Sequence, residues 1–156
     1  MAVKNVVSIV RVDESGVEAA VRRAIELAGG LKPLITPDSK VLVKPNLCWP
    51  EPSGMGYTTD CRVTEAVTKI VLELDPESVV IGESSSAGYE FDTSRSTEEA
   101  FRVSGTADAA HRLGVECRNL NRDEVKEVTV KEPYVMDKVR IAKTAVDTHG
   151  QARGTL

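Results

Sequence analysis

Three short runs of β-branched and aliphatic residues constrain the fold more than any other feature of this sequence. The runs lie at Val6–Val12, Val41–Val43 and Val79–Ile81, and each is almost continuously apolar. Such runs are typical of strands that are covered on both faces, as in a parallel sheet. Segments with helical periodicity follow the runs, which gives the order β-α-β-α-β-α-β. This order predicts an α/β fold with three layers, α/β/α, around a mostly parallel sheet.

The segments between the runs carry apolar stripes at helical spacing and have recognisable ends. Ser15–Glu18 matches a capping box that opens the first helix, and Gly29–Gly30 ends it. The second helix begins near Cys61, with Thr59 or Asp60 as its cap.

The C-terminal part of the sequence predicts a third helix, a fourth strand and an antiparallel pair. A second capping box, Ser96–Glu99, opens the helix, and we expect Gly105 to bend or split it. The fourth strand falls at residues 115–120. Weak alternation in Val125–Val130 and Lys138–Ala142, with a proline between them, predicts an antiparallel pair added to the sheet.

The last residues show no periodic pattern, so we expect a flexible tail. The predicted organisation is one α/β domain over residues 1–143 and a tail over residues 144–156. A chain of 156 residues is long enough for one domain with its own core.

Composition excludes several classes of protein. The net charge is −4 with no basic cluster, so nucleic acid is not an expected partner. No stretch approaches the ~18 apolar residues that span a bilayer, and the N-terminal run does not resemble a signal peptide. We therefore expect a cytoplasmic protein without a membrane partner. Cys48, Cys61 and Cys117 match neither a disulfide framework nor a zinc or iron–sulfur spacing, so we expect free thiols.

A long loop rich in Pro and Gly, residues 44–60, follows the second apolar run. Ligands of α/β proteins bind outside the carboxyl ends of the strands, and ordered loops of this length are usually functional. A second loop, from Gly82 onward, follows the neighbouring strand with small and polar residues. The sequence thus predicts a small-molecule site at this edge of the sheet. The candidate ligand-binding residues are Lys44, Asn46, Thr58, Thr59, Asp60, Glu83, Ser84, Ser85 and Ser86.

Each candidate also has a purely structural interpretation. Lys44 either holds an anionic ligand or extends its charge into solvent at the sheet edge, and Asn46 either orients a ligand or shapes a turn. The helix N-terminus near Asp60 either binds an anion or is only capped, and the charge of Asp60 favours the cap. The serines either bind ligand oxygens or form a solvated loop. Three large side chains either cover a ligand or pin the loop to the domain: Trp49, Met55 and Tyr57.

No catalytic motif is present, so the catalytic residues stay unknown. The Gly-Lys-Ser/Thr ending of a P-loop and the Gly-x-Gly-x-x-Gly fingerprint are both absent. Neither His111 nor His149 has a partner that indicates catalysis. A weak alternative is a site for a hard cation, and because its ligands lack a spacing signature we predict no metal site. Its ligands would be Asn46, Asp60, Glu83 and Asp92.

Three motifs in order resemble the domain of unknown function family 362: VLVKPN at Val41–Asn46, TTD at Thr58–Asp60 and VVIGESS at Val79–Ser85. The similarity runs from about Val6 to Val146. Members of this family are often described as iron–sulfur-associated, because some carry a ferredoxin-like module. Their cluster-binding cysteines have no counterpart here, so the resemblance implies no cofactor in this chain. Members also continue beyond the last predicted strand, so the resemblance implies that this chain corresponds to their N-terminal half.

These observations leave three hypotheses about function and do not decide whether the protein is an enzyme. The first is a site for an anionic or oxygen-rich small molecule, which the family resemblance connects to a redox enzyme. The second is a non-catalytic, assembly-dependent partial domain, and the third and weakest is a metal-dependent hydrolase. We expect a homo-oligomer, because three helices leave apolar surface or a strand edge open.

Overall fold

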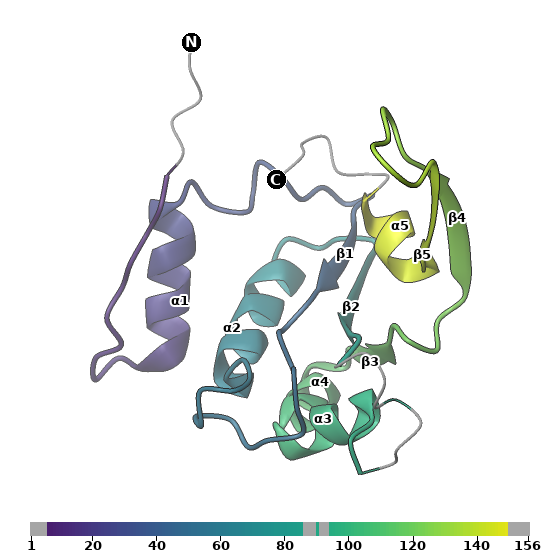
Figure 1. The fold of residues 1–156 in the computed structure, drawn as a ribbon. Coiled ribbons are helices and arrows are strands. Elements are labelled where there is room, and N and C mark those ends of the chain that lie inside the picture. The colour runs from purple at the N-terminus through teal and green to yellow at the C-terminus, as the bar shows by residue number, and fades with distance from the viewer. Residues whose placement is uncertain (1–5, 86–89, 91–93, 150–156) are drawn as a thin grey trace.

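The computed structural model describes residues 6–85, 90 and 94–149, and it has an α/β fold (Figure 1). Three parallel strands form the main sheet in the order β1-β2-β3. They are β1 (Lys40–Val43), β2 (Ser78–Glu83) and β3 (Glu116–Asn119). The predicted strands at Val41–Val43 and Val79–Ile81 are therefore confirmed, and β2 lies at the centre.

The pairing register sorts the side chains of the sheet onto two faces. Val41 pairs with Val79, and Ile81 pairs with Cys117, so these four side chains share one face. Ile81 is fully buried there and packs in a cluster with Phe101 of the helical layer. The hydrophobic core of the domain lies on this face.

On the opposite face, Gly82 lies beneath two leucine side chains. A Cβ atom at Gly82 would stand 2.6 Å from Leu42 Cδ1 and 3.2 Å from Leu120 Cδ2. Any larger residue would push these side chains apart, so the glycine of the VVIGESS motif has a packing role.

Within the described residues, five helices accompany the sheet. They are α1 (Gly16–Leu27), α2 (Cys61–Leu72), α3 (Thr97–Val103), α4 (Thr106–Leu113) and α5 (Lys143–His149). α2, α3 and α4 contact the sheet from the side of the core, and α1 packs against α2 (Figure 1). α5 contacts β1 and lies on the opposite face of the sheet. Arg118 pairs with Gly82 and shares its face, and its side chain donates a hydrogen bond to Thr144 of α5.

Two helix starts agree with their predicted caps. The Asp60 carboxylate accepts a hydrogen bond from the Arg62 amide at 2.9 Å, which caps α2. The Ser96 hydroxyl accepts one from the Glu99 amide at 3.2 Å, which caps α3. Both caps supply acceptors for amides that have no partner inside the helix.

Gly105 splits the third predicted helix into α3 and α4, as expected, with a φ of +80° that suits glycine.

The capping box predicted at Ser15 is wrong, because the Ser15 side chain makes no cap hydrogen bond in α1. The Ser15 hydroxyl donates instead to the Asp13 carboxylate, a competing local acceptor.

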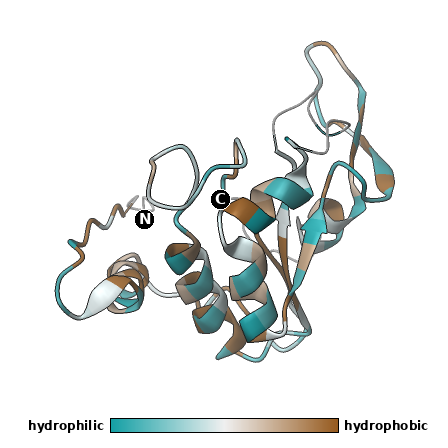
Figure 2. Ribbon diagram, turned by 90° about the horizontal axis from the view of Figure 1, so that it is seen from below, coloured by the Kyte–Doolittle hydropathy of each residue, from teal (hydrophilic) through white to brown (hydrophobic). Residues whose placement is uncertain are grey.

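The strand predicted at Val6–Val12 is wrong. Residues 6–13 form no strand, and Ile9 is 92% exposed. Figure 2 shows this hydrophobic segment running beside α1 and apart from the sheet, where the Ser8 hydroxyl donates to the Ala24 carbonyl at 2.7 Å. A strand needs a neighbour for its backbone hydrogen bonds, and apolar composition alone does not supply one.

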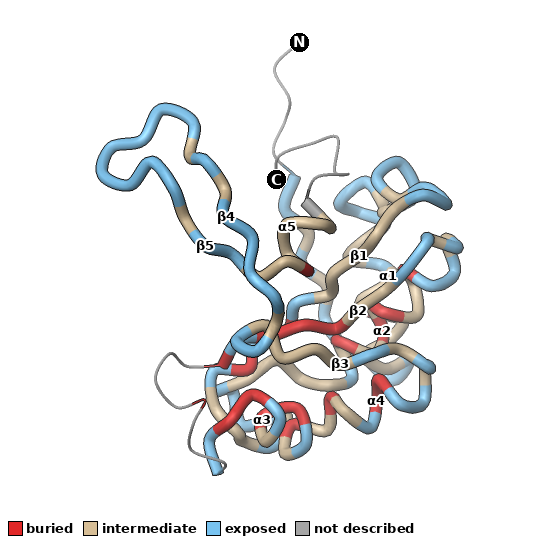
Figure 3. Tube along the Cα trace, turned by 90° about the vertical axis from the view of Figure 1, so that its right-hand side faces the viewer, coloured by how far each residue is buried: buried red, intermediate tan, exposed pale blue. Residues whose placement is uncertain are grey.

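β4 (Val125–Thr129) and β5 (Lys138–Ala142) form the predicted antiparallel pair. The prediction that this pair joins the main sheet is wrong, because it is a separate two-stranded sheet that projects from the domain (Figure 3). Charged residues run along both strands, with Glu127 opposite Arg140. Charged edges resist pairing with further strands, which accounts for the separation.

The flexible tail predicted from Thr144 is wrong for its first part, because residues 143–149 form α5. The Thr144 amide donates to the Asp123 carboxylate at 2.8 Å, which fixes the start of this helix. The stabilising contact is distant in sequence, so the local pattern did not reveal it. Residues 150–156 lie outside the described part of the chain.

Substitution of two isoleucines tests this arrangement. Ile81→Ala removes a fully buried side chain, so we expect it to lower the free energy of unfolding by about 2–5 kcal/mol. Ile9→Ala is the matched control at an exposed position and should change stability by less than about 0.5 kcal/mol. Urea unfolding measures both. An equally large loss for Ile9→Ala would show that residues 6–12 form a buried strand after all.

Candidate functional site

A buried carboxylate connects the carboxyl ends of β1 and β2. Glu83 ends β2, its side chain is 4% exposed, and the Lys44 ammonium lies 2.9 Å from its carboxylate. The backbone amides of Leu47 and Ser84 also donate to this carboxylate, at 3.2 Å and 2.7 Å. The three donors satisfy a charge that would otherwise be very unfavourable in the interior. Glu83 therefore holds Lys44 and the start of the 44–60 loop in place.

Asn46, Thr58 and Thr59 come together at the base of the same loop. The backbone amide of Asn46 donates to Thr59 Oγ1 at 2.9 Å. The backbone carbonyl of Asn46 accepts a hydrogen bond from the backbone amide of Thr59 at 2.8 Å. Thr58 Oγ1 donates to the Asn46 carbonyl at 3.1 Å, and Leu47 forms a bridge with Thr58. The two threonines thus close the loop, while the Asn46 side chain stays exposed.

Asp60 does not share the contacts of the other predicted residues. Besides capping α2, its carboxylate pairs with the Arg62 guanidinium at 2.6 Å. The Arg62 side chain lowers the pKa of Asp60. The capping interpretation of Asp60 is confirmed.

The three serines after β2 differ from one another. Ser84 is exposed and donates its amide to Glu83. Ser85 is buried, and its amide donates to Thr97 Oγ1 at 3.1 Å, while its hydroxyl has no hydrogen-bond partner in the described part of the chain. Ser86 lies outside the described residues.

Sequence reasoning missed a second buried carboxylate near this edge, that of Glu90. It accepts hydrogen bonds from the amide and the hydroxyl of Thr97 at 3.1 Å and 2.8 Å, and from Arg122 Nε at 2.8 Å. The Asn119 side chain also donates to it. The only signal in the sequence is an isolated Glu between the aromatic residues of the YEF segment, which does not predict these distant partners.

A hollow borders the 44–60 loop. It has a volume of about 490 Å³ and is lined by Cys48, Trp49, Glu51 and Tyr57. The Asn46 side-chain amide donates to Cys48 Sγ at 3.1 Å, so the hollow adjoins the strand ends. Leu47, which is fully buried, anchors the loop, whereas Met55 and Tyr57 are both exposed and do not pin it to the domain.

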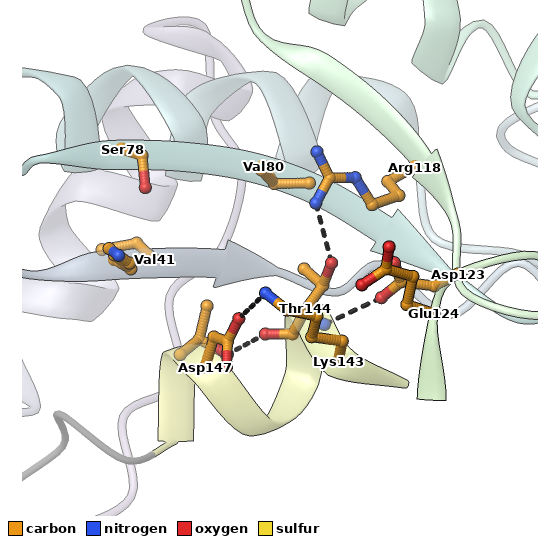
Figure 4. A pocket seen from close by; sticks show the side chains of 11 residues that line it. Val41, Ser78, Val80, Arg118, Asp123, Glu124, Lys143, Thr144 and Asp147 are labelled. Atoms are coloured by element: carbon orange, nitrogen blue, oxygen red, sulfur yellow. Dashed lines mark hydrogen bonds and ion pairs between the residues drawn. The ribbon is translucent and has the colours of Figure 1, made fainter. Parts of the chain in front are cut away.

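A second cleft, of about 320 Å³, lies between the sheet and α5 (Figure 4). Arg118 Nη1 donates to Thr144 Oγ1 at 2.8 Å, and the Lys143 ammonium pairs with Asp147 across one turn of α5. Hydrogen bonds from Lys126 and Lys143 lower the pKa of Asp147 to about 2. Among these contacts, the Arg118–Thr144 hydrogen bond joins α5 to the main sheet, and the Lys126–Asp147 pair joins α5 to β4.

Two further observations concern the described residues alone. They contain no group of three His, Cys, Asp or Glu side chains arranged to hold a metal ion, and Asp92 of the predicted cation set lies outside them. Within the same residues, no helix has the length and apolar character needed to cross a membrane.

The fold and the polar strand ends define an α/β protein with a candidate site at the carboxyl edge of a parallel sheet. Residues 41–149 match the family model described as "Domain of unknown function (DUF362)". This match covers most of the 156 residues, so the chain belongs to that family. The match begins at Val41, later than the expected start near Val6. No curated protein and no solved structure shows a significant match to the chain.

The hydrogen bonds of Glu90 predict a pH-dependent stability. Burial acts to raise the pKa of Glu90, but hydrogen bonds from Arg122, Thr97 and Asn119 outweigh it and lower the pKa from 4.5 to about 2. Their contribution is complete above pH 4.5 and is lost as the pH falls through about 2. We therefore expect Glu90→Gln to destabilise the protein at neutral pH and to differ less from the parent as the pH falls.

Urea unfolding at a series of pH values measures this effect. The parent protein is the control, because the prediction concerns how the difference in unfolding free energy between the parent and Glu90→Gln changes with pH. A difference that stays constant from pH 7 to about 2 would contradict the ionised, hydrogen-bonded state of Glu90.

Proposed function

We propose that the carboxyl ends of β1 and β2 bind a small, oxygen-rich molecule through Lys44, Asn46 and Ser84. The observation that supports this most is the fixed Lys44 ammonium beside buried Glu83. An ammonium has three N–H donors, and the Lys44 side chain is 49% exposed although it is held by Glu83. Donors of this group therefore point toward solvent from a fixed position.

The charge of the site narrows the kind of ligand. Lys44 and Glu83 form a pair without net charge, which favours a carbonyl, a hydroxyl or a single carboxylate over a polyphosphate. The exposed Asn46 side chain adds a donor and an acceptor, and the Ser84 hydroxyl adds another of each. An oxygen acceptor bound here would be contacted from two strand ends at once.

Four of the other predicted residues have supporting roles in this proposal. Glu83 positions Lys44, Thr58 and Thr59 close the loop that carries Asn46, and Asp60 caps α2. None of these four would have to touch the ligand.

Titration of the single tryptophan tests the proposal, because Trp49 lies on the same loop. Lactate, succinate and inorganic phosphate are the probes, and we expect saturable changes in emission that favour lactate, which carries a single carboxylate and a hydroxyl. Asn46→Ala should weaken binding about 10-fold, the equivalent of ~1.4 kcal/mol. The fold should be unaffected, because the Asn46 side chain is exposed.

The double variant Lys44→Met with Glu83→Gln removes the ion pair without leaving a buried charge alone, and it should also lose binding. Lys131→Met, an exposed lysine on the hairpin, is the matched control. Binding that is unchanged in both site variants would refute the proposed site.

The second hypothesis, a non-catalytic domain that depends on assembly, is supported by a different observation. Tyr134 and Val135 at the tip of the β4–β5 hairpin are almost fully exposed, and so are Val7 and Ile9 in the N-terminal segment. Isolated two-stranded hairpins are only marginally stable in water, so packing against a second copy of the chain would stabilise this one. We propose that they pack in a homo-oligomer, for which a symmetric pair is the default.

Multi-angle light scattering tests this second proposal. We expect a dimer or larger species at micromolar concentration, and Tyr134→Ser with Val135→Ser should shift it toward the monomer. Lys131→Ser on the same hairpin is the control. A monomer with one cooperative unfolding transition at every concentration would rule the assembly out.

We also propose a cytoplasmic location. Cys48, Cys61 and Cys117 all lie within the described residues and form no disulfide with one another there, which fits a reducing compartment. Subcellular fractionation tests this, and recovery with secreted or membrane material would contradict it.

A further inference from the structure

We infer that residues 6–27, here called the α1 arm, detach from α2 when salt screens the ion pairs between the two helices, while the rest of the domain stays folded. This inference goes beyond both proposed functions and does not depend on them. The arm lies outside residues 41–149, which match the family model. Within the described part of the chain, α1 packs mainly against α2, on the side away from the strands (Figure 1).

Apolar burial between α1 and α2 is slight. Ala20 is the one buried residue of α1, and Leu27 at the end of the helix is 46% exposed. Because apolar stabilisation follows the buried area, a single buried alanine contributes little. A hollow of about 240 Å³ borders Val17 of α1 and Ala66 of α2, so the two helices are not closely packed there. Apolar packing therefore supplies only part of the attachment.

Complementary charges supply a further part. Lys69 Nζ of α2 donates to the Glu18 carboxylate at 3.0 Å. One turn further along both helices, Arg22 Nη1 donates to Glu73 Oε2 at 2.7 Å. Each of these four side chains is more than a third exposed, from 35% for Arg22 to 55% for Glu73. Ion pairs with this exposure are weak individually, and dissolved salt screens them.

The connection that follows α1 allows the arm to move. Gly29 and Gly30 directly follow the helix end, with φ values of +108° and +75°. A Cβ atom at either glycine would meet no atom within 4 Å, and Leu34 further along is 61% exposed. The connection is thus not packed against the domain at these positions. Rotation at the two glycines can move α1 away from α2 without displacing β1.

Hydrogen exchange measured by mass spectrometry tests the inference, because it follows the local opening of each segment. Peptides covering Gly16–Leu27 report on α1, and peptides covering Ser78–Glu83 report on β2 as the internal reference. We expect the α1 amides to exchange faster than those of β2 in low salt. Raising sodium chloride to about 1 M, where the Debye length is about 3 Å, should speed exchange in α1 about 5-fold and leave β2 unchanged.

Two neighbouring arginines of α1 assign the effect to the ion pairs between the helices. Arg22→Met removes the link to Glu73, so α1 should exchange about 5-fold faster in low salt and respond less to added salt. Arg23→Met is the matched control, because Arg23 pairs with Glu26 of the same helix. This control should change the exchange of α1 and its salt response by less than about 2-fold. Slow exchange in β2 verifies the fold of each variant.

Exchange in α1 that is as slow as in β2 at every salt concentration would overturn the inference, and so would a salt effect of equal size on both elements. Fast exchange in α1 without a salt response would also overturn it, because the ion pairs would then not control the arm. The Tyr134→Ser, Val135→Ser variant, which we expect to favour the monomer, separates this result from assembly. The salt effect on α1 should persist in that variant, and its loss there would assign the effect to assembly and contradict the inference.

Discussion

The Glu83 carboxylate is the group on which the architecture of the strand ends depends. An ionised carboxylate buried without partners would be too unfavourable to retain, so its three donors are required and not incidental. They come from the end of β1, from the loop that follows it and from the residue after β2. One buried group thus fixes the relative position of two strands and a long loop, and the hollow on that loop is positioned by the same contact.

The elements that sequence alone predicted correctly are those whose causes are local. A continuous apolar run such as Val79–Ile81 marks a buried strand, and Asp60 directly before an apolar stripe marks a helix start. The split at Gly105 is also local, because only the backbone conformation of that residue is involved. In each case the information lies within a few residues of the feature.

The features that sequence reasoning missed depend on partners far along the chain. Val6–Val12 has the composition of a strand but pairs with none, and α5 is fixed by Asp123, about twenty residues earlier. For the site, parallel topology predicted that Lys44 and Glu83 lie at one edge. It did not predict that Glu83 is buried or that it neutralises Lys44, because burial is decided by packing that only the folded chain provides.

This difference changes the ligand that the edge favours. Lys44 counted as a free positive charge suits an anion, whereas Lys44 paired with Glu83 suits an oxygen acceptor with little net charge. The exposed side chains of Asn46 and Ser84 add donors and acceptors beside this pair, so hydrogen bonding and not net charge would select a ligand at this edge.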